Sequence, residues 1–364
     1  MGRAGNDGYH RNKEHPHGRR AEGPECHPPL ASPQTLLGLI HGNWTPQVLY
    51  VAAQLGLADL LADGPKSGNA LAQATATHPE ALTRLLRGLT SLGLCEEVEG
   101  GCFALTPLGT CLRPGGPGSL RHSAIFRGEG LYQIWGHLLH SVQTGEAAFS
   151  MVWGIPSYDY FQMHPEVAAT FNRSQTERTQ VVAEAVVGAY DFSRFGALGD
   201  VGGGYGTLLL TILQAPPMLR GIVFDRVHAV EGARQTIAAH GCTERCEAVA
   251  GDFFQAVPSG EDAYLLKSVL TDWDDARSTV ILRNCRRAAP QARLLVVEPV
   301  RPTRVEPSAA HQAALAVDLN MLVATGGEGR SEAGFCTLFS AAGYQLVHMF
   351  PTALSFSILE GAPT

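Results

Sequence analysis

Carboxylates and glycines stand where short apolar runs end, and together they could bind a nucleoside. The first run leads into "LGDVGGGYG", which contains Asp200, Gly202 and Gly204. Glycines here let the backbone turn tightly and approach a ligand, and the helix that follows presents its amino terminus. The second run ends at Asp225, whose carboxylate can accept hydrogen bonds from two ribose hydroxyls. Glycines after the first run and an aspartate at the end of the second favour a nucleoside-binding site over two aspartates that simply face solvent.

A third run, ending in "GDFF", adds two side chains of the same kind. Asp252 can meet an adenine amino group, and Phe253 can flank the ring. A dinucleotide fingerprint would require Gly or Ala at 207, where this chain has Thr207. The D-x-G-x-G-x-G pattern therefore predicts S-adenosylmethionine (SAM) rather than NAD as the cofactor.

The elements that must position these residues begin after Phe192. Short apolar runs alternate with helical stretches: "GALGDVGGGYG", "LRGIVFD", "CEAVAGDFF", "AYLLKSVL" and "ARLLVVEPV". This alternation is typical of an α/β fold with a doubly wound parallel sheet that is covered on both faces. The last two runs, "YQLVHMF" and "LSFSILEG", lie too close together for a crossover helix, so we expect an antiparallel hairpin at the sheet edge.

The preceding chain divides into three parts. Residues 1–32 lack apolar periodicity and are expected to be a disordered tail, in which the scattered His10, His15, His17 and His27 indicate no built metal site. Residues 33–120 contain short helices and two strands around 99–101, the outline of a winged helix. Residues 121–190 are helical, and the sheet domain occupies 191–364.

Winged helices often bind DNA, but this one has the wrong charges for that role. Its expected recognition helix, "HPEALTRLLRGLTSLG", offers only Arg84 and Arg87 as cations beside a leucine-rich face. Such a face favours packing against another protein surface. The net charge of −7, without a Lys/Arg block, also argues against nucleic acid as a partner.

Composition places the chain among ordinary globular proteins of two domains. It has 364 residues, of which 45% are hydrophobic and 17% charged. No apolar run reaches the roughly 18 residues of a membrane span, and the polar start is not a secretory signal. The 8 cysteines form no CxxC pair, so we expect reduced thiols in a cytoplasmic protein, with no metal.

Residues 33–364 resemble the SAM-dependent O-methyltransferases of the plant-type and acetylserotonin O-methyltransferase family. The resemblance is carried by "DVGGGYG", "FD" at 224–225, "GDFF", "LLKSVLTDWDD", "ILRNCRRA", "LLVVEPV" and "AAGY". It implies a class I methyltransferase Rossmann-like domain, an N-terminal winged-helix dimerisation domain, and a homodimer whose partner chain helps to close the substrate pocket. Bacterial members often act on aromatic antibiotics. By match, Lys267 would contact the carboxylate end of SAM.

The chain departs from this family at the base. The family's histidine falls on Thr271 in "LLKSVLTDWDD", and its carboxylate partners fall on Glu298 and Gly329. Glu298 is therefore the one member that is retained, with Glu328 a single residue away from the other position. A neutral imidazole can accept a phenolic proton near pH 7, whereas an aliphatic hydroxyl cannot. Thr271 can at most form a hydrogen bond or shape the pocket.

Three interpretations of the missing histidine stay open. In the first, methyl transfer proceeds without a base, because holding a substrate oxygen in line with the methyl group supplies much of the rate. In the second, the base is relocated to Asp272 or to a histidine of the helical region: His122, His137, His140, His164 or His311. In the third, SAM is retained but the reaction is a hydroxylation, decarboxylation or cyclisation.

We favour methyl transfer to the oxygen, or alternatively the carbon, of a phenolic natural-product intermediate. A SAM-sensing winged-helix regulator is disfavoured, because the winged helix lacks a basic stripe. The resemblance places the acceptor site at Phe171 and Gln175 in "TFNRSQTER" and at Asn320 and Met321 in "DLNMLVATGG". An apolar pocket with few charges would suit a planar aromatic scaffold. Phe171 and Met321 also have the spacing of plain core residues.

Overall fold

The computed structural model describes residues 1–2, 32–116, 118–215 and 218–364. The chain forms two compact units, Met1–Asn43 and Trp44–Thr364. The expected tail, with His10, His15, His17, His27 and Cys26, lies outside the described residues. The predicted boundaries at 120/121 and 190/191 stay predictions.

Helix α1 (Pro33–His41) belongs to the first unit. Ser32 caps it, because its hydroxyl accepts a hydrogen bond from the backbone N–H of Thr35 at 3.2 Å. Its leucine and isoleucine side chains point into solvent, with exposed fractions of 51% to 73%. Solvent-exposed apolar side chains of this density on one short helix indicate a surface made for packing.

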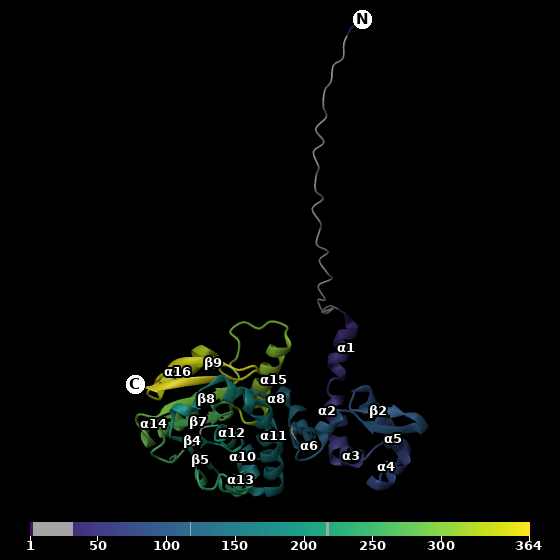
Figure 1. The fold of residues 1–364 in the computed structure, drawn as a ribbon, viewed down its shortest axis with the longest axis horizontal. Helices are drawn as coiled ribbons and strands as arrows, with labels where there is room; N and C mark the ends of the chain where they lie inside the picture. The colour runs from purple at the N-terminus through teal and green to yellow at the C-terminus, as the bar shows by residue number, and fades with distance from the viewer. Residues whose placement is uncertain (3–31, 117, 216–217) are drawn as a thin grey trace. The chain divides into compact units, whose positions relative to one another are not determined.

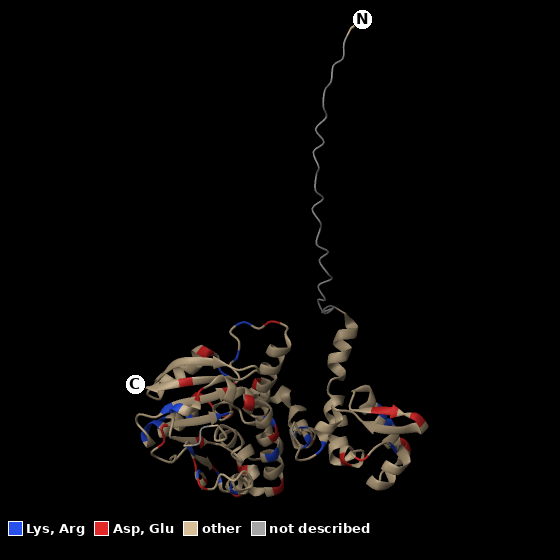
Figure 2. Cartoon of the chain, viewed as in Figure 1, with Lys and Arg blue, Asp and Glu red and all other residues tan. Residues whose placement is uncertain are grey.

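The winged helix is present in the second unit, as predicted. Its elements are α2 (Trp44–Gln54), α3 (Leu57–Leu60), β1 (Lys66–Ser67), α4 (Gly68–Thr75), α5 (Pro79–Ser91), β2 (Cys95–Val98), η1 (Glu99–Gly101), β3 (Cys102–Leu105) and η2 (Gly109–Leu112). The strands pair antiparallel in the order β1-β3-β2. Helix α5 buries Leu82, Leu86 and Leu89, while Arg87 donates to Glu97 at 3.2 Å. Figure 2 shows the acidic residues along β2.

Six helices lie between residues 121 and 190. The helices are α6 (Arg121–Gly128), α7 (Gly130–Trp135), α8 (Leu138–Thr144), α9 (Ala148–Trp153), α10 (Ser157–Met163) and α11 (Pro165–Ala189). Helix α6 packs against both α2 and α11. The carbonyl of Gly128 accepts a hydrogen bond from Gln47 at 2.7 Å, and a Cβ at Gly128 would lie 2.2 Å from the Cβ of Tyr50. Only glycine permits this close approach.

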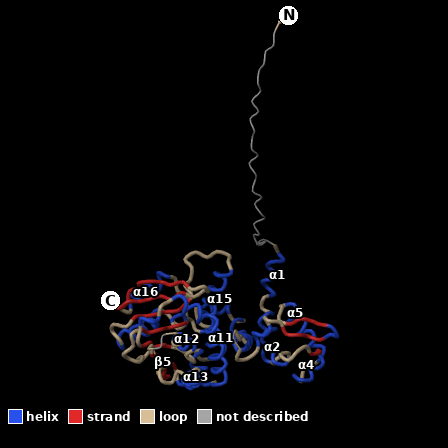
Figure 3. Tube along the Cα trace, in the orientation of Figure 1, coloured by secondary structure: helices blue, strands red, loops and turns tan. Residues whose placement is uncertain are grey.

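The remaining residues form a seven-stranded sheet that confirms the doubly wound prediction (Figures 1 and 3). Its order is β6-β5-β4-β7-β8-β10-β9. The strands are β4 (Ala197–Val201), β5 (Arg220–Asp225), β6 (Cys246–Ala250), β7 (Ala263–Lys267), β8 (Arg293–Glu298), β9 (Tyr344–Pro351) and β10 (Ser357–Pro363). The other elements are η3 (Phe192–Arg194), α12 (Thr207–Ile212), α13 (Val227–Ala239), η4 (Leu270–Asp272), α14 (Asp275–Ala288), α15 (Ala309–Ala324) and α16 (Glu332–Ala341).

Strands β4 to β8 run parallel, whereas β10 is antiparallel to both β8 and β9. The expected edge hairpin is thus present, with β10 inserted between β8 and β9. Glu360 of β10 is buried, and its carboxylate lies 3.2 Å from Arg194 and 3.7 Å from Arg293. These arginines compensate the charge of a carboxylate inside the sheet.

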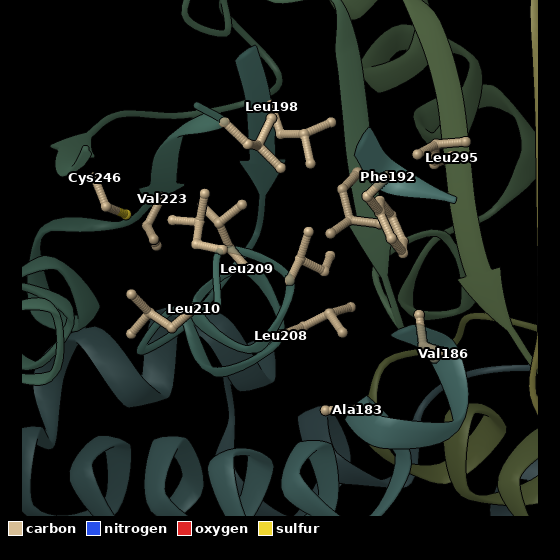
Figure 4. Packing of buried hydrophobic residues seen from close by; sticks show 14 of the residues in the cluster. Ala183, Val186, Phe192, Leu198, Leu208, Leu209, Leu210, Val223, Cys246 and Leu295 are labelled. Atoms are coloured by element: carbon tan, nitrogen blue, oxygen red, sulfur yellow. The ribbon is translucent and has the colours of Figure 1, made fainter. Parts of the chain in front are cut away.

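The sheet separates two apolar cores because its side chains alternate between faces. Leu295 and Val297 face the core formed with α11, α12 and α13, while Leu294 and Val296 face the core formed with α14 and α16. Figure 4 shows the first core, where the leucines of α12 pack between β4, β5 and η3. This two-sided burial fixes the strand register, because a shift by one residue would exchange the faces.

No described helix is long and apolar enough to cross a membrane. Among the described residues, we find no cluster of three or more potential metal ligands. Seven cysteines are described and all are free; four of them are buried: Cys95, Cys242, Cys246 and Cys285.

Candidate functional site

A cavity opens at the carboxyl ends of the central strands. Strand β4 lies between β5 and β7, so the connections that follow β4 and β7 leave on opposite sides and create a crevice there. The cavity encloses about 910 Å³, part of it open to solvent. Its wall includes six predicted cofactor residues: Asp200, Gly202, Gly204, Asp225, Phe253 and Lys267.

The glycine turn lets bare backbone face this cavity. Gly202 has a φ of +74°, and a Cβ there would lie 2.7 Å from a methyl group of Val269. Gly206, with a φ of +78°, precedes the first turn of α12, and a Cβ there would meet Val223 at 2.8 Å. Both positions combine a left-handed backbone with close packing, so any other residue would displace the turn.

Asp225 closes the turn from the next strand. Its carboxylate accepts hydrogen bonds from the backbone N–H of Gly204 at 2.7 Å and of Arg226 at 2.6 Å. Burial raises the pKa of Asp225, although these two bonds oppose the shift. Each carboxylate oxygen retains acceptor capacity, which suits the two hydroxyls of a ribose.

Asp200 supplies a buried carboxyl group with an unpaired oxygen. Its Oδ2 atom is buried and has no hydrogen-bond partner among the described residues. Burial, reinforced by the charge of Asp225, raises the pKa of Asp200 to about 7, and Lys267 opposes the rise. An unsatisfied buried carboxylate oxygen is costly, and a cationic ligand group would relieve it. SAM carries such a group in its ammonium, so the residues present fit this cofactor.

Lys267 and Asp252 occupy the two other predicted strand ends. Burial lowers the pKa of Lys267 to about 8. Asp252 does not line the cavity; it accepts hydrogen bonds from the N–H of Phe254 at 2.9 Å and from Gln255 at 3.4 Å. Its neighbour Phe253 does line the cavity. The adenine contact of Asp252 stays a prediction.

A second cavity, of about 580 Å³, adjoins the first. All four predicted acceptor residues line it: Phe171, Gln175, Asn320 and Met321. Its other walls include further aromatic rings: Phe126, Phe149, Tyr158 and Phe161.

The aromatic rings of this acceptor cavity also pack on one another. Phe171 stacks on Phe161 with ring centroids 4.8 Å apart and meets Phe126 at 5.4 Å. Phe171 therefore belongs to the core and to the cavity wall, two roles that its helical spacing could not separate. Asn320 is held by Trp135, whose ring N–H donates to it at 3.0 Å. Such walls accommodate a flat aromatic molecule.

Four residues line both cavities: Tyr158, Phe171, Gln175 and Asp272. The hydroxyl of Tyr158 donates a hydrogen bond to Oδ2 of Asp272. Burial raises the pKa of Asp272 to about 6, opposed by this hydrogen bond and by the charges of Arg178 and Lys267. Burial, and then Asp272, raise the pKa of Tyr158 well above its ordinary value. A carboxylate at this junction faces the place where cofactor and acceptor meet.

Thr271 and Glu298, the other predicted catalytic residues, line neither cavity. Both are buried, and the backbone N–H of Thr271 donates to the carboxylate of Glu298 at 3.0 Å. Burial raises the pKa of Glu298 to about 7. A Cβ at Gly327 would lie 2.2 Å from the carbonyl oxygen of Thr271, so the loop after α15 presses on this segment. The structure thus places both residues behind the wall, and their catalytic roles stay predictions.

Arg330 holds the segment that carries Asp272. Its side chain is 3% exposed, and its guanidinium donates to the carbonyls of Leu270 and Trp273, each at 2.7 Å. It also donates to Asp275 at 2.8 Å. These hydrogen bonds attach Arg330 to the backbone on both sides of Asp272 and to the first turn of α14, and so hold this segment in place.

The relocated-base histidines do not lie at the described cavities. None of the five lines either cavity: His122, His137, His140, His164 and His311. His228, which sequence reasoning missed, does line the cofactor cavity, beside Asp225. Glu328 is exposed and lines neither described cavity, so it does not replace the carboxylate that is absent at Gly329.

Sequence reasoning also missed Tyr158, Arg226, Arg127 and Arg178. Arg226 lines the cofactor cavity, and its guanidinium lies 5.6 Å from the ring centre of Tyr158. Arg127 and Arg178 line the acceptor cavity. Arg226 follows Asp225 directly in the chain, and this adjacency was an available signal.

Comparison with known families matches two parts of the chain. Residues 135–345 match the model of the O-methyltransferase domain, and residues 37–114 match that of the O-methyltransferase dimerisation domain. The first match covers strands β4 to β8 and most of the residues that line the two cavities, and the second covers the winged helix.

Individual relatives agree with these matches. The phenazine O-methyltransferase PhzM of Lysobacter antibioticus is 46% identical over 336 residues, which are 92% of this chain and 97% of the relative. The crystal structure of LaPhzM superposes with a TM-score of 0.88 over 91% of this chain and 99% of that chain. Human N-acetylserotonin methyltransferase, solved in complex with SAM, has a TM-score of 0.83 at 27% identity, over 91% of this chain and 97% of that one.

Proposed function

The chain belongs to the O-methyltransferase family and is a SAM-dependent methyltransferase, and we propose that it methylates a hydroxyl oxygen of a planar aromatic small molecule. The acceptor would be an intermediate of bacterial natural-product metabolism, because the relative PhzM is named for phenazine, a planar aromatic ring system. A hydroxylase, a decarboxylase, a cyclase or a SAM-sensing regulator finds no support among the relatives described above.

The observation that carries this proposal is the wall shared by the two cavities. The cofactor cavity contains the glycine turn, Asp225 and the unpaired Asp200, while the acceptor cavity is lined by aromatic rings. They meet at Asp272 and Tyr158. Methyl transfer needs donor and acceptor in contact and in line, and two adjoining cavities with a common wall provide that arrangement.

SAM, when bound, supplies an electrophilic methyl group on its sulfonium. The chain must then orient the acceptor oxygen and remove its proton. Phe171 and Gln175 extend from α11 into both cavities and can orient the acceptor ring. Asp272 faces the same place, and a carboxylate with a pKa of about 6 can accept a proton near neutral pH. Tyr158 and Arg330 hold Asp272 and its loop in place. We therefore assign proton acceptance to Asp272 rather than to Thr271.

We further propose that the enzyme works as a homodimer in the cytoplasm. A dimerisation domain is present, and α1 exposes four apolar side chains, Leu36, Leu37, Leu39 and Ile40. Seven free cysteines suit a reducing compartment. Light scattering of the full chain would give twice the monomer mass. A monomer at micromolar concentration would contradict the dimer proposal.

The test of the reaction is incubation with methyl-labelled SAM and a panel of hydroxylated phenazines and naphthalenes. We expect a labelled product whose mass exceeds that of the acceptor by one methylene unit, with the label on oxygen. Alkaline shifts of the phenol absorbance disappear on O-methylation, which separates this product from a C-methylated one. An unlabelled product of lower or hydroxylated mass would overturn the proposal.

A further inference from the structure

Two arginine side chains line the acceptor cavity without a carboxylate partner among the described residues. Arg127 extends from α6 and Arg178 from α11. The one hydrogen bond recorded for either guanidinium joins Arg178 to the neutral side chain of Gln175, at 3.3 Å. A cavity meant for a neutral aromatic molecule needs no cation, so the pair requires an explanation.

The charge of Arg178 also acts on Arg127. Partial burial, and then the charge of Arg178, lower the pKa of Arg127 to about 10, although Arg127 as a whole is exposed to solvent. Burial lowers the pKa of Arg178 as well, and the charge of Asp272 opposes that change. Repulsion between the two guanidinium groups raises the free energy of the empty cavity, and an anionic ligand would lower it.

The acidic groups nearby are already engaged. Asp272 is the one carboxylate in the wall of the acceptor cavity, and it accepts the hydrogen bond of Tyr158. Glu177 precedes Arg178 in α11, but its carboxylate accepts from the N–H groups of His122 at 2.9 Å and Ser123 at 2.8 Å. It also lies 2.8 Å from the ring nitrogen of His122.

Glu177 therefore has a positioning role instead. By binding backbone N–H groups in the first turn of α6, it holds α6 against α11. Arg127 lies one turn further along α6, and Arg178 lies next to Glu177 on α11. The same contact that occupies Glu177 thus holds the two arginines at one cavity.

We propose that the acceptor is an aromatic hydroxy acid, and that Arg127 and Arg178 bind its carboxylate while its ring lies among the phenylalanines. Guanidinium groups match the planar geometry of a carboxylate and can bind it through two parallel hydrogen bonds. The ring would pack on Phe161 and Phe171, and the hydroxyl would reach Asp272 at the wall shared with the cofactor cavity. This inference rests on the proposed function and specifies its substrate.

A carboxylate requirement makes a definite claim about specificity. An acceptor whose carboxylate is replaced by a carboxamide keeps its shape and its hydroxyl but loses its charge. The half-buried Arg178 and the more exposed Arg127 would then face a neutral group. We expect this to weaken binding by about 10²-fold, because sites built for a charged partner reject analogues that leave them unpaired.

The test compares hydroxynaphthoates and hydroxyphenazine carboxylates with their carboxamides, for binding to the complex of the full chain with S-adenosylhomocysteine. Calorimetry should show acid binding about 10²-fold tighter than amide binding in the wild type. Arg127→Gln and Arg178→Gln should each weaken acid binding at least 10-fold and leave amide binding within about 3-fold. Arg173→Gln, which removes an exposed cation from the same helix outside either cavity, is the matched control and should change neither.

Equal binding of acids and amides by the wild type would overturn the inference. Equal loss of acid and amide binding in Arg178→Gln would mean that Arg178 acts only on Asp272 and does not bind the carboxylate. That result would also contradict the inference. Thermal denaturation identifies variants that fail to fold, and Arg→Lys replacements then repeat the comparison with the charge retained. Methylation of amides without preference would leave the proposed function intact, whereas bound acids that are never methylated would contradict the function and not the carboxylate site.

Discussion

The cofactor cavity and the acceptor cavity are built from different materials. The floor of the cofactor cavity is formed at strand ends of the sheet by the glycine turn, Asp200 and Asp225, while α11 supplies part of its wall. The acceptor cavity consists of long side chains on helix faces, among them Phe126, Arg127 and Met321. Substitutions on helices change the acceptor cavity without moving the sheet. One scaffold can therefore keep a cofactor while changing its acceptor.

The two cavities also differ in charge. The cofactor cavity contains buried carboxylates whose pKa values burial raises, and it requires a cationic ligand group. The acceptor cavity contains two arginines and one carboxylate. Asp272 lines both cavities, so its substitution should affect the reaction itself. Substitution of a residue that lines only one cavity should affect the binding of one ligand.

The largest effect is expected for Asp272→Asn. The variant should lose about 10²-fold or more in kcat, because the amide cannot accept a proton, while SAM affinity stays within about 5-fold. In the wild type kcat should rise with pH through about 6, since the carboxyl is neutral below its raised pKa and charged above it. The variant should lack this step. A kcat within a few-fold of wild type would remove Asp272 from the chemistry.

The next effect should fall on the cofactor alone. Asp225→Ala removes the carboxylate that closes the glycine turn and is predicted to bind the ribose, and we expect SAM affinity to fall about 10²-fold by calorimetry. Glu231→Ala, an exposed carboxylate on the helix after the same strand, is the control and should bind SAM normally. Unchanged binding in Asp225→Ala would show that the ribose lies elsewhere.

A smaller effect is expected for Asp200→Asn, which should increase stability and weaken SAM binding. Its folded-state pKa of about 7 lies above the ordinary 3.8, so the ionised form opposes folding above pH 7, and this cost disappears as pH falls below 3.8. Asp200→Asn should thus raise the free energy of unfolding of the ligand-free chain by about 1–3 kcal/mol at pH 8, measured with urea. The gain should shrink with falling pH, and SAM should bind about 10-fold more weakly. A variant that is less stable at pH 8 would contradict this assignment.

The smallest effect is expected for Thr271→Ala. The threonine lies behind the wall, and its recorded contact with Glu298 is made by the backbone N–H, which alanine retains. We expect kcat to change by less than about 5-fold. A loss of about 10³-fold would mean that the hydroxyl takes part in the chemistry.

The cofactor cavity was largely predictable because its signal is local. A short apolar run followed by Gly or Asp marks the end of a parallel strand, and parallel strands bring such ends to one edge of the sheet. Asp225 was predicted from such a strand end, and Lys267 was predicted from its position in the motif that resembles the family. Asp252 was also placed at a strand end, but whether its carboxylate faces the ligand depends on the turn that it caps.

The acceptor cavity was predictable only in part. Phe171 and Gln175 came from one helix, and Arg178 lies on the same face at the i+7 position, whereas Arg173 does not. That spacing was a usable signal for Arg178. No comparable signal pairs Arg127 with Arg178, because they come from different helices that are joined by the contacts of Glu177 with the first turn of α6.

By itself, the sequence determined the sheet, the glycine turn and the cofactor, because backbone conformation and strand ends depend on neighbouring residues. Only the tertiary structure decided which groups surround the acceptor. It placed Tyr158 against Asp272, 114 residues away in the chain, and put Thr271 behind the cavity wall. The physical reason is that helix faces meet through side-chain packing between distant segments. That packing decides which buried polar groups find partners within the protein and which are left for a ligand.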